Sequence, residues 1–375
     1  MTQDTPGKLN GQLRFCLSAI GFLSSAATQA WVLFLPLHAQ ELGASDLLVG
    51  LIIASYGVTF FFSSLVFGRQ ADLHGRLKFI RVGLALAIPA YAAELLAASP
   101  PALMVVMGVI GAAMGMASAA LMAYVHDMEG AIGKFSSYSS LGWFFSSVAG
   151  AILLSNQALF LLASFLSLVA LALTIPLGER AGRVAPMSVL SMDVFRQNWL
   201  VYVPMVLRQV GAQSVWTIYP LFLASIGADK FWIAVISGIN NGTQVLTMRL
   251  ADRIQPSKAV AIGLICSSLF FAYHGLATQY WQVLPIQVVL AVAWAGLWVG
   301  ASNLLLQAGT EKATSMGILY SSNSFSQVLG PLVGGNVSQA FGFRPLMFLA
   351  SGMALAGLGL RWRLKGRVET AWSRR

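Results

Sequence analysis

The chain has 375 residues, of which 57% are hydrophobic and only 10% are charged, and its mean hydropathy is +0.74. These values exclude a soluble domain and indicate a polytopic protein embedded in a lipid bilayer. In a soluble chain the net charge of +10 would suggest a nucleic-acid partner. We expect no such partner here, because the placement of Lys and Arg in loops between apolar segments accounts for the excess.

Apolar runs of about twenty residues, the length that crosses a bilayer as a helix, recur along the whole chain. They predict an all-α membrane protein with twelve transmembrane helices. The first run is expected to be a retained span, because no small-residue cleavage site follows it. The predicted spans cover residues 13–37, 47–67, 79–98, 101–125, 136–155, 157–178, 198–223, 231–249, 258–277, 281–306, 314–337 and 343–361.

The basic residues are distributed unequally between the two sides of this topology. If both termini are cytoplasmic, all but three of the 23 Lys and Arg residues lie on the cytoplasmic side. The exceptions are Lys230 and Arg344 on the opposite side and Arg208 within the seventh span. Since cytoplasmic loops of membrane proteins are enriched in Lys and Arg, we expect a multi-pass protein of the cytoplasmic membrane with both termini inside.

The second half of the sequence repeats features of the first half at a constant spacing. Such a repeat is typical of membrane folds that are built from two similar bundles. It predicts two pseudo-symmetric six-helix bundles, residues 1–178 and 198–375, joined by a cytoplasmic linker at residues 179–197. The repeated pairs include Gln29 and Gln213, Pro36 and Pro220, Gly43 and Gly227, and Gly150 and Gly334.

Small and charged residues cluster between the second and third spans, in the sequence GRQADLHGRLKFIR. This cluster resembles the loop signature of the major facilitator superfamily, Gly-x-Leu-Ala-Asp-Arg-x-Gly-Arg-Arg, although three of its positions differ. A shorter copy, LADR, follows the eighth span in the second half. The resemblance implies a motif that controls conformational change, formed by Gly68, Asp72, Gly75, Arg76, Asp252 and Arg253.

The eleventh span contains a second resemblance, because Gly330, Pro331, Gly334 and Gly335 are similar to the Gly-Pro-x-x-Gly-Gly element of the family. Either Pro331 introduces a bend that flexes during transport, or the small residues permit close helix packing. Drug antiporters of the family carry this element in the fifth span and an Arg in the fourth. This chain has no proline in the former and no Arg in the latter, which argues against proton-driven drug antiport.

In the resembled fold, the first, fourth, seventh and tenth spans surround a central cavity. We therefore expect solute-binding residues on these spans, with interhelix packing as the alternative for each residue. Arg208 either anchors an anionic solute or extends to the cytoplasmic interface. The candidate solute-binding residues are Gln29, Arg208, Gln209, Gln213, Trp216, Trp294, Trp298 and Asn303.

Two further ionisable residues lie within predicted spans: Glu94 near the outer end of the third and His274 near the outer end of the ninth. Because the burial of an ionisable group must be compensated, each is a candidate for binding a coupling proton. The alternative is that both side chains reach the membrane interface from peripheral helices.

The resemblance implies a secondary active or facilitative transporter that moves a small organic solute by alternating access. An anionic metabolite is the favoured solute, and a proton or another ion is a candidate for coupling. Efflux of amphipathic, drug-like compounds is the alternative, followed by a nontransporting membrane receptor. We expect no enzyme activity, cofactor or metal site, since the sequence has neither a phosphate-binding loop ending in Lys-Ser or Lys-Thr nor paired His or Cys motifs.

Overall fold

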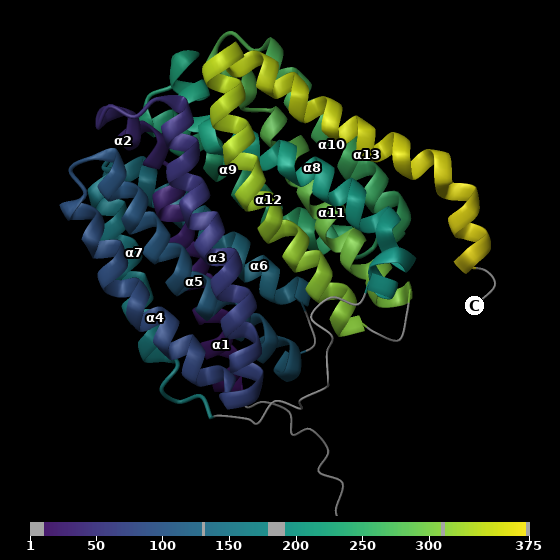
Figure 1. Cartoon of the computed structure of the whole chain (residues 1–375), viewed down its shortest axis with the longest axis horizontal. Coiled ribbons are helices and arrows are strands. Elements are labelled where there is room, and N and C mark those ends of the chain that lie inside the picture. Colours follow the sequence, from purple (N-terminus) through teal and green to yellow (C-terminus); the bar gives the residue numbers. More distant parts are fainter. Residues whose placement is uncertain (1–10, 130–131, 179–191, 309–311, 373–375) are drawn as a thin grey trace, which may run out of the picture.

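The computed structural model describes residues 11–129, 132–178, 192–308 and 312–372. These residues form thirteen α-helices and two short 3-10 helices, and none of them lies in a strand, which confirms the predicted all-α class (Figure 1). The helices are α1 (Gly11–Val32), α2 (Leu35–Glu41), α3 (Asp46–His74), α4 (Arg76–Ala92), η1 (Ala93–Leu96), α5 (Pro100–Glu129), α6 (Ile132–Leu153), α7 (Asn156–Leu173), α8 (Met192–Ser225), α9 (Lys230–Ala251), α10 (Pro256–Leu276), η2 (Tyr280–Val283), α11 (Ile286–Ala308), α12 (Lys312–Phe341) and α13 (Phe343–Trp372).

The helices provide the twelve spans expected from the sequence. The first span consists of α1 and α2 and is interrupted at Leu33 and Phe34. Pro36 at the start of α2 has no N–H to bond to the carbonyl one turn earlier, which weakens the helix at this point. Within the described residues, eight segments are long and apolar enough to cross a membrane. The helices α6, α8, α9 and α12 are not among these eight, because they carry polar residues toward the cavity between the two halves of the fold.

The seventh span begins earlier than expected. Helix α8 starts at Met192 and continues for 34 residues. Residues 192–197, which the sequence assigned to the linker, are therefore helical. Residues 179–191, the rest of the predicted linker, lie outside the described residues.

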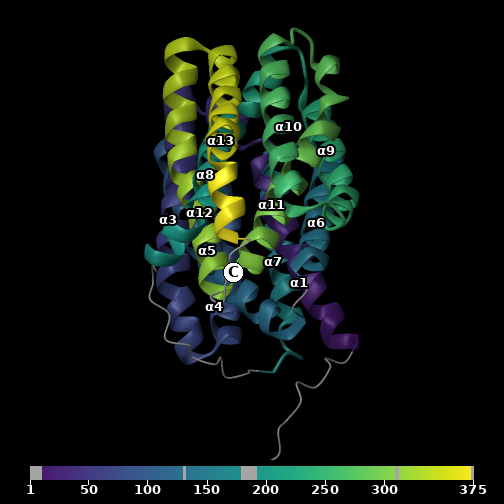
Figure 2. The same cartoon turned by 90° about the vertical axis from the view of Figure 1, so that its right-hand side faces the viewer.

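The helices pack as two groups, called here the first half (α1 to α7) and the second half (α8 to α13). In the first half α5 packs against α3 and α4, and α1 packs against α6 and α7. In the second half α8 packs against α12 and α13, and α10 packs against α11 and α13. The two halves meet mainly where α6 contacts α9 and α3 contacts α12. Figure 1 shows the two groups beside each other, and in Figure 2, where they overlap, the helices run along one common direction.

The sequence repeat has a structural counterpart in the turns after the first and seventh spans. Gly43 and Gly227 adopt φ angles of 90° and 91°, which glycine reaches without steric cost. In each turn the next residue donates its N–H to a carbonyl five positions back, from Ala44 to Ala39 at 2.9 Å and from Ala228 to Leu223 at 3.0 Å. The two halves therefore close these helices with the same backbone turn.

The halves are held together toward one end of the molecule, where α2 lies, called here the α2 end. Three hydrogen bonds that involve side chains join the halves between the middle of the helices and this end, counted over the described residues. They are Leu47 N to Gln339 Oε1 at 2.9 Å, Lys230 Nζ to Glu41 Oε1 at 3.1 Å, and Asn241 Nδ2 to Ser147 Oγ at 3.0 Å.

At the α2 end, α3 and α12 approach so closely that no side chain fits between them. A Cβ atom at Gly50 would lie 2.5 Å from the carbonyl oxygen of Pro331 and 3.1 Å from Gly335 Cα. A Cβ atom at Gly330 or Gly334 would collide with α8. Helix α12 continues through Pro331. The element from Gly330 to Gly335 thus holds α12 close against α3 on one side and against α8 on another.

Candidate functional site

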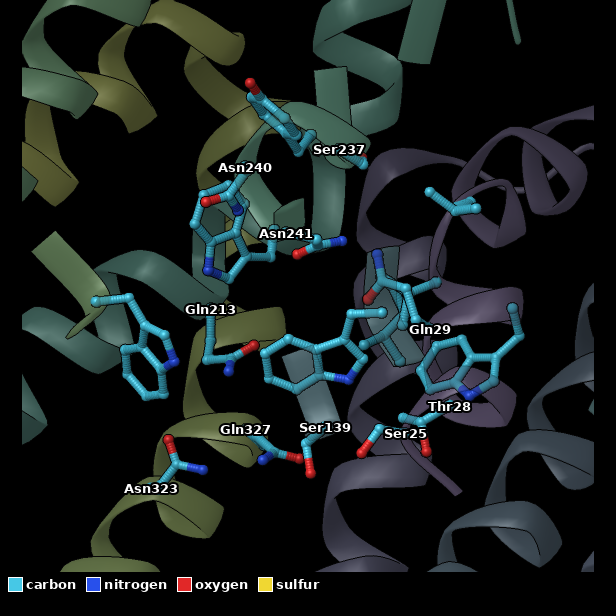
Figure 3. Close-up of a pocket in the computed structure, with 18 of the residues that line it drawn as sticks. Ser25, Thr28, Gln29, Ser139, Gln213, Ser237, Asn240, Asn241, Asn323 and Gln327 are labelled. Atoms are coloured by element: carbon cyan, nitrogen blue, oxygen red, sulfur yellow. The ribbon is translucent and has the colours of Figure 1, made fainter. Parts of the chain in front are cut away.

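A cavity of about 480 Å³ lies between the two halves. Its walls come from α1, α3, α5 and α6 of the first half and from α8, α9, α11 and α12 of the second. This volume is in the range of pockets that enclose small organic molecules. Figure 3 shows polar side chains from both halves directed into this space.

Nine carboxamide and four indole side chains contribute to the cavity wall. Carboxamides can both donate and accept hydrogen bonds, and indoles offer a flat apolar face with one N–H donor. Over the described residues, the lining contains no carboxylate, and Arg208 is its one charged side chain. The carboxamides belong to Gln29, Gln209, Gln213, Asn240, Asn241, Gln244, Gln287, Asn323 and Gln327. The indoles belong to Trp31, Trp143, Trp216 and Trp294.

Gln29 and Gln213, which the sequence repeat relates to each other, both line the cavity. Gln29 lies on α1 and Gln213 on α8, and they face the space from opposite walls in Figure 3. Neither carboxamide has a hydrogen bond to another side chain among the described residues. Both are therefore free to bind a solute.

Arg208 is buried, with only 2% of its surface exposed, and does not extend to the interface. Its Nε donates to Ser267 Oγ of α10 at 2.9 Å, and its Nη1 donates to Gln209 Oε1 at 2.8 Å. The guanidinium carbon lies 5.6 Å from the ring centroid of Trp294 and 5.9 Å from that of Phe271. No carboxylate pairs with it, and its Nη2 has no hydrogen bond in the part of the chain that the structure describes. The guanidinium is thus held in place by neutral groups while its charge stays uncompensated.

The structure places two of the eight candidate solute-binding residues, Trp298 and Asn303, outside the cavity lining. Trp298 is one turn beyond Trp294 on α11, where it stacks on Trp294 at 5.4 Å and packs edge-on against Tyr320 at 5.1 Å. It belongs to the apolar core of the second half. Asn303 lies further along α11 and is not among the lining residues. Their role in solute binding stays a prediction, since neither residue lines this cavity.

Other lining residues come from spans that the sequence analysis did not consider. Tyr56 and Phe60 of α3 contribute aromatic surface, and Ser139 and Trp143 of α6 contribute a hydroxyl and an indole. The resemblance directed attention to the first, fourth, seventh and tenth spans. The polar residues of the fifth span, which is α6, could have indicated that this helix lines the cavity. The sequence of α3 contains no comparable signal.

The residues of the predicted conformational motif occupy the ends of α3 and α9. Gly75 has a φ angle of 101° and joins α3 directly to α4. Gly68 lies within α3, and Asp252 and Arg253 form the turn after α9. The side chain of Asp72 lies outside the described side chains. The role of this motif therefore stays a prediction.

Glu94 and His274 do not reach the interface, contrary to the alternative considered from the sequence, because both are buried, at 2% and 0% exposure. His274 donates its Nδ1–H to the carbonyl of Phe270 at 2.8 Å. The Tyr219 hydroxyl lies 2.8 Å from His274 Nε2 and accepts from Gln287 Nε2 at 2.9 Å. Tyr219 and Gln287 line the cavity, so His274 positions a part of its wall from behind.

Two similar helical halves around a central cavity define a membrane transporter of the alternating-access type. The family model described as "Major Facilitator Superfamily" matches residues 17–243 and 205–374. The chain therefore belongs to the major facilitator superfamily, whose members carry small-molecule solutes and are not enzymes.

Individual members of the family are similar to the chain over most of its length. The multidrug resistance protein MdtG of Salmonella dublin is 25% identical, covering 93% of this chain and 94% of the relative. A mutant of the nucleoside transporter NupG has the same fold, with a TM-score of 0.80, 14% identity and coverage of 94% of this chain and 99% of that structure. The human organic anion transporter MFSD10 gives a TM-score of 0.72 at 16% identity, covering 94% of this chain and all of that one.

Proposed function

We propose that the chain carries a small organic anion across the cytoplasmic membrane by alternating access, with Arg208 as the anchor of the solute. The observation that carries this proposal is the uncompensated guanidinium at the cavity wall. A buried charge without a counter-charge is costly, and a ligand carboxylate or phosphate would remove that cost.

The planar guanidinium of Arg208, whose N–H donors form a fork, is suited to this role because its orientation is fixed before the solute arrives. Ser267 and Gln209 hold Nε and Nη1, and Trp294 covers one face of the guanidinium. Nη2 remains available, and a solute that displaces Gln209 from Nη1 gains two parallel bonds. A preorganised group loses little conformational entropy on binding.

The carboxamides would form hydrogen bonds with the part of the solute beyond its anionic group and so contribute to specificity. Gln29 and Gln213 act from opposite halves, so a solute that bonds to both joins the first half to the second. The indole of Trp216, packed at 5.3 Å against Tyr219, offers a fixed apolar face between polar groups. This wall fits an anion that also carries a ring and neutral hydrogen-bonding groups.

The transport cycle would proceed by rocking of the two bundles, residues 1–178 and 198–375, about the cavity. The contacts that join the halves near the α2 end support a state in which this end is closed. The excess of Lys and Arg on the opposite side supports cytoplasmic termini, so the closed end would face away from the cytoplasm.

Efflux of amphipathic compounds is the second candidate. It is favoured by the four indoles of the cavity wall and by the relatives that are named multidrug resistance proteins. Such a transporter would rely on apolar contact, so Arg208 would contribute little to solute affinity. The two candidates therefore differ in the predicted effect of replacing this residue.

The test uses Arg208→Gln and Arg208→Lys in proteoliposomes, with a panel of anionic, neutral and cationic solutes. The loss of hydrogen bonds to a charged group costs about 1.5–3 kcal/mol, which weakens binding of an anion by about 10- to 150-fold in the Gln variant. The Lys variant should be intermediate, because an ammonium retains the charge but lacks the fork. Arg361→Gln is the matched control, since Arg361 bonds to Ser257 outside the cavity wall.

Unchanged transport by Arg208→Gln would refute the anchor. A cation as the best substrate would do the same, and it would favour the efflux candidate. Thermal stability of each variant, measured without solute, separates a loss of binding from a loss of folding.

A further inference from the structure

A carboxyl group is buried outside the solute cavity, at the α2 end of the first half. Glu94 lies in η1, and its side chain is 0% exposed. Its Oε1 accepts a hydrogen bond from Asn156 Nδ2 of α7 at 2.7 Å and lies 3.1 Å from His38 Nε2 of α2. The other carboxyl oxygen, Oε2, is buried and has no hydrogen-bond donor among the described residues.

The amide that binds Glu94 has an unsatisfied oxygen as well. In the part of the chain that the structure describes, Asn156 Oδ1 is buried and has no donor, although Nδ2 of the same amide is bonded to Glu94. Two side chains joined by one hydrogen bond thus each retain an unpaired acceptor. An ionised carboxylate can only accept, whereas a protonated carboxyl has one O–H donor. A single proton on Glu94 Oε2 would supply a donor to Asn156 Oδ1 and leave both groups fully bonded.

We propose that Glu94, Asn156 and His38 form a proton-binding site and that the proton stabilises the closed state of the α2 end. In the bound form the Glu94 O–H donates to Asn156 Oδ1. Oε1 then accepts from Asn156 Nδ2 and from the Nε2–H of a neutral His38. His38, whose side chain is 15% exposed, exchanges the proton with water.

A chain of titratable groups connects this site to the second half. His38 Nδ1 lies 3.6 Å from Glu41 Oε2, and Glu41 Oε1 lies 3.1 Å from Lys230 Nζ of α9. Helices α4, α5 and α7 also pack against η1, but over the described residues they bring no charged group within ion-pairing distance of Glu94. The titratable groups that face the site are therefore His38, Glu41 and, across the boundary between the halves, Lys230.

Closure and proton binding are linked because the closed state buries Glu94 Oε2. When α2 moves away and water reaches this oxygen, water supplies the missing donor and the proton is no longer required. A ligand stabilises the state that binds it more tightly. The proton is such a ligand for the closed state, so its loss favours opening. This coupling does not depend on whether the solute is an anion or an amphipathic compound.

The first measurement detects the proton itself in the purified full-length chain. Infrared difference spectra recorded during a pH titration should show the C=O stretching band of a protonated carboxyl, which disappears as the pH rises. Glu94→Gln should lack this band, because a carboxamide has no proton to lose. A spectrum without any such band at every pH, or one in which Glu94→Gln retains the whole band, would overturn the proposal.

The second measurement follows closure with spin labels on cysteines at Ile152 and Ala340, two exposed positions on opposite halves at the α2 end. In the wild-type background the population with the longer distance should rise with pH, by at most about tenfold per pH unit for one proton. Glu94→Gln keeps a donor for Asn156 Oδ1, so it should remain closed at every pH. A pH response in Glu94→Gln equal to that of the wild type would contradict the coupling.

Two controls make the outcomes specific. Glu41→Gln removes the charge that bonds to Lys230 but leaves Glu94 in place, so the carboxyl band should persist while the distance becomes less sensitive to pH. Loss of the band in this variant would count against Glu94 as its source. Binding of the anionic solute to Glu94→Gln should persist, because Glu94 is not in the cavity wall.

Discussion

Replacing Gly50 by Ala should open the α2 end of the molecule. The added Cβ atom would lie 2.5 Å from the carbonyl oxygen of Pro331 and 3.1 Å from Gly335 Cα, both of which are backbone atoms that cannot move aside alone. Overpacking of this kind costs about 1–3 kcal/mol. Because α3 and α12 belong to different halves, separation of the halves relieves the collision, so the cost falls on the closed state.

That cost corresponds to a shift of about 5- to 150-fold in the ratio of open to closed molecules, at about 1.4 kcal/mol for each factor of ten. The labels at Ile152 and Ala340 report this ratio in a background in which Cys16 and Cys266 are replaced by Ala. We expect the longer distance to gain population in Gly50→Ala, while thermal stability changes little.

A glycine inside one half provides the contrasting variant. A Cβ atom at Gly263 of α10 would lie 2.8 Å from the carbonyl oxygen of Ala293 of α11, and both helices belong to the second half. Gly263→Ala should therefore lower thermal stability without changing the distance between the halves. Gly352→Ala should change neither, because no atom of the described residues lies within 4 Å of its added carbon. If Gly50→Ala behaved like Gly263→Ala, the closed contact would not control the opening of the α2 end.

Two further predictions concern the cavity and the predicted motif. Cysteines at Gln29 and Gln213 should react with a small water-soluble thiol reagent and be protected by solute, whereas a cysteine at Ser268, buried against Ser351, should be inert; unreactive Gln29 and Gln213 variants would assign both residues to helix packing. Asp72→Asn should slow the exchange between conformations without abolishing solute binding, and wild-type transport rates in vesicles at equal expression would contradict this expectation.

The fold could be predicted from the sequence because span length and charge bias are properties of single segments. Apolar runs located all twelve spans, including the four that are less apolar. The break before Pro36 was missed, because the sequence does not distinguish this proline from Pro220, through which α8 continues without a break. The start of α8 at Met192 was also missed, because hydropathy marks the membrane and not the end of a helix that extends beyond it.

The candidate site could be predicted only in part, because partners across helices are not visible in a linear pattern. Arg208 was recognised as a charge within a span, but its contacts with Ser267 and Trp294 depend on the packing of α8 against two other helices. Glu94 was recognised in the same way, while Asn156, 62 positions away, gives the carboxyl its hydrogen bond. Sequence reasoning thus identified the groups that need compensation and could not identify the groups that provide it.

The interruption between α1 and α2 makes the two halves mechanically unequal. Helix α8 passes through Pro220 without a break, whereas the seven residues of α2 are separated from α1 at the corresponding proline, Pro36. A short separate helix can tilt on a faster timescale than a whole bundle can rotate. A tilt of α2 alone would expose the proposed proton site at Glu94 to water without separating the two halves.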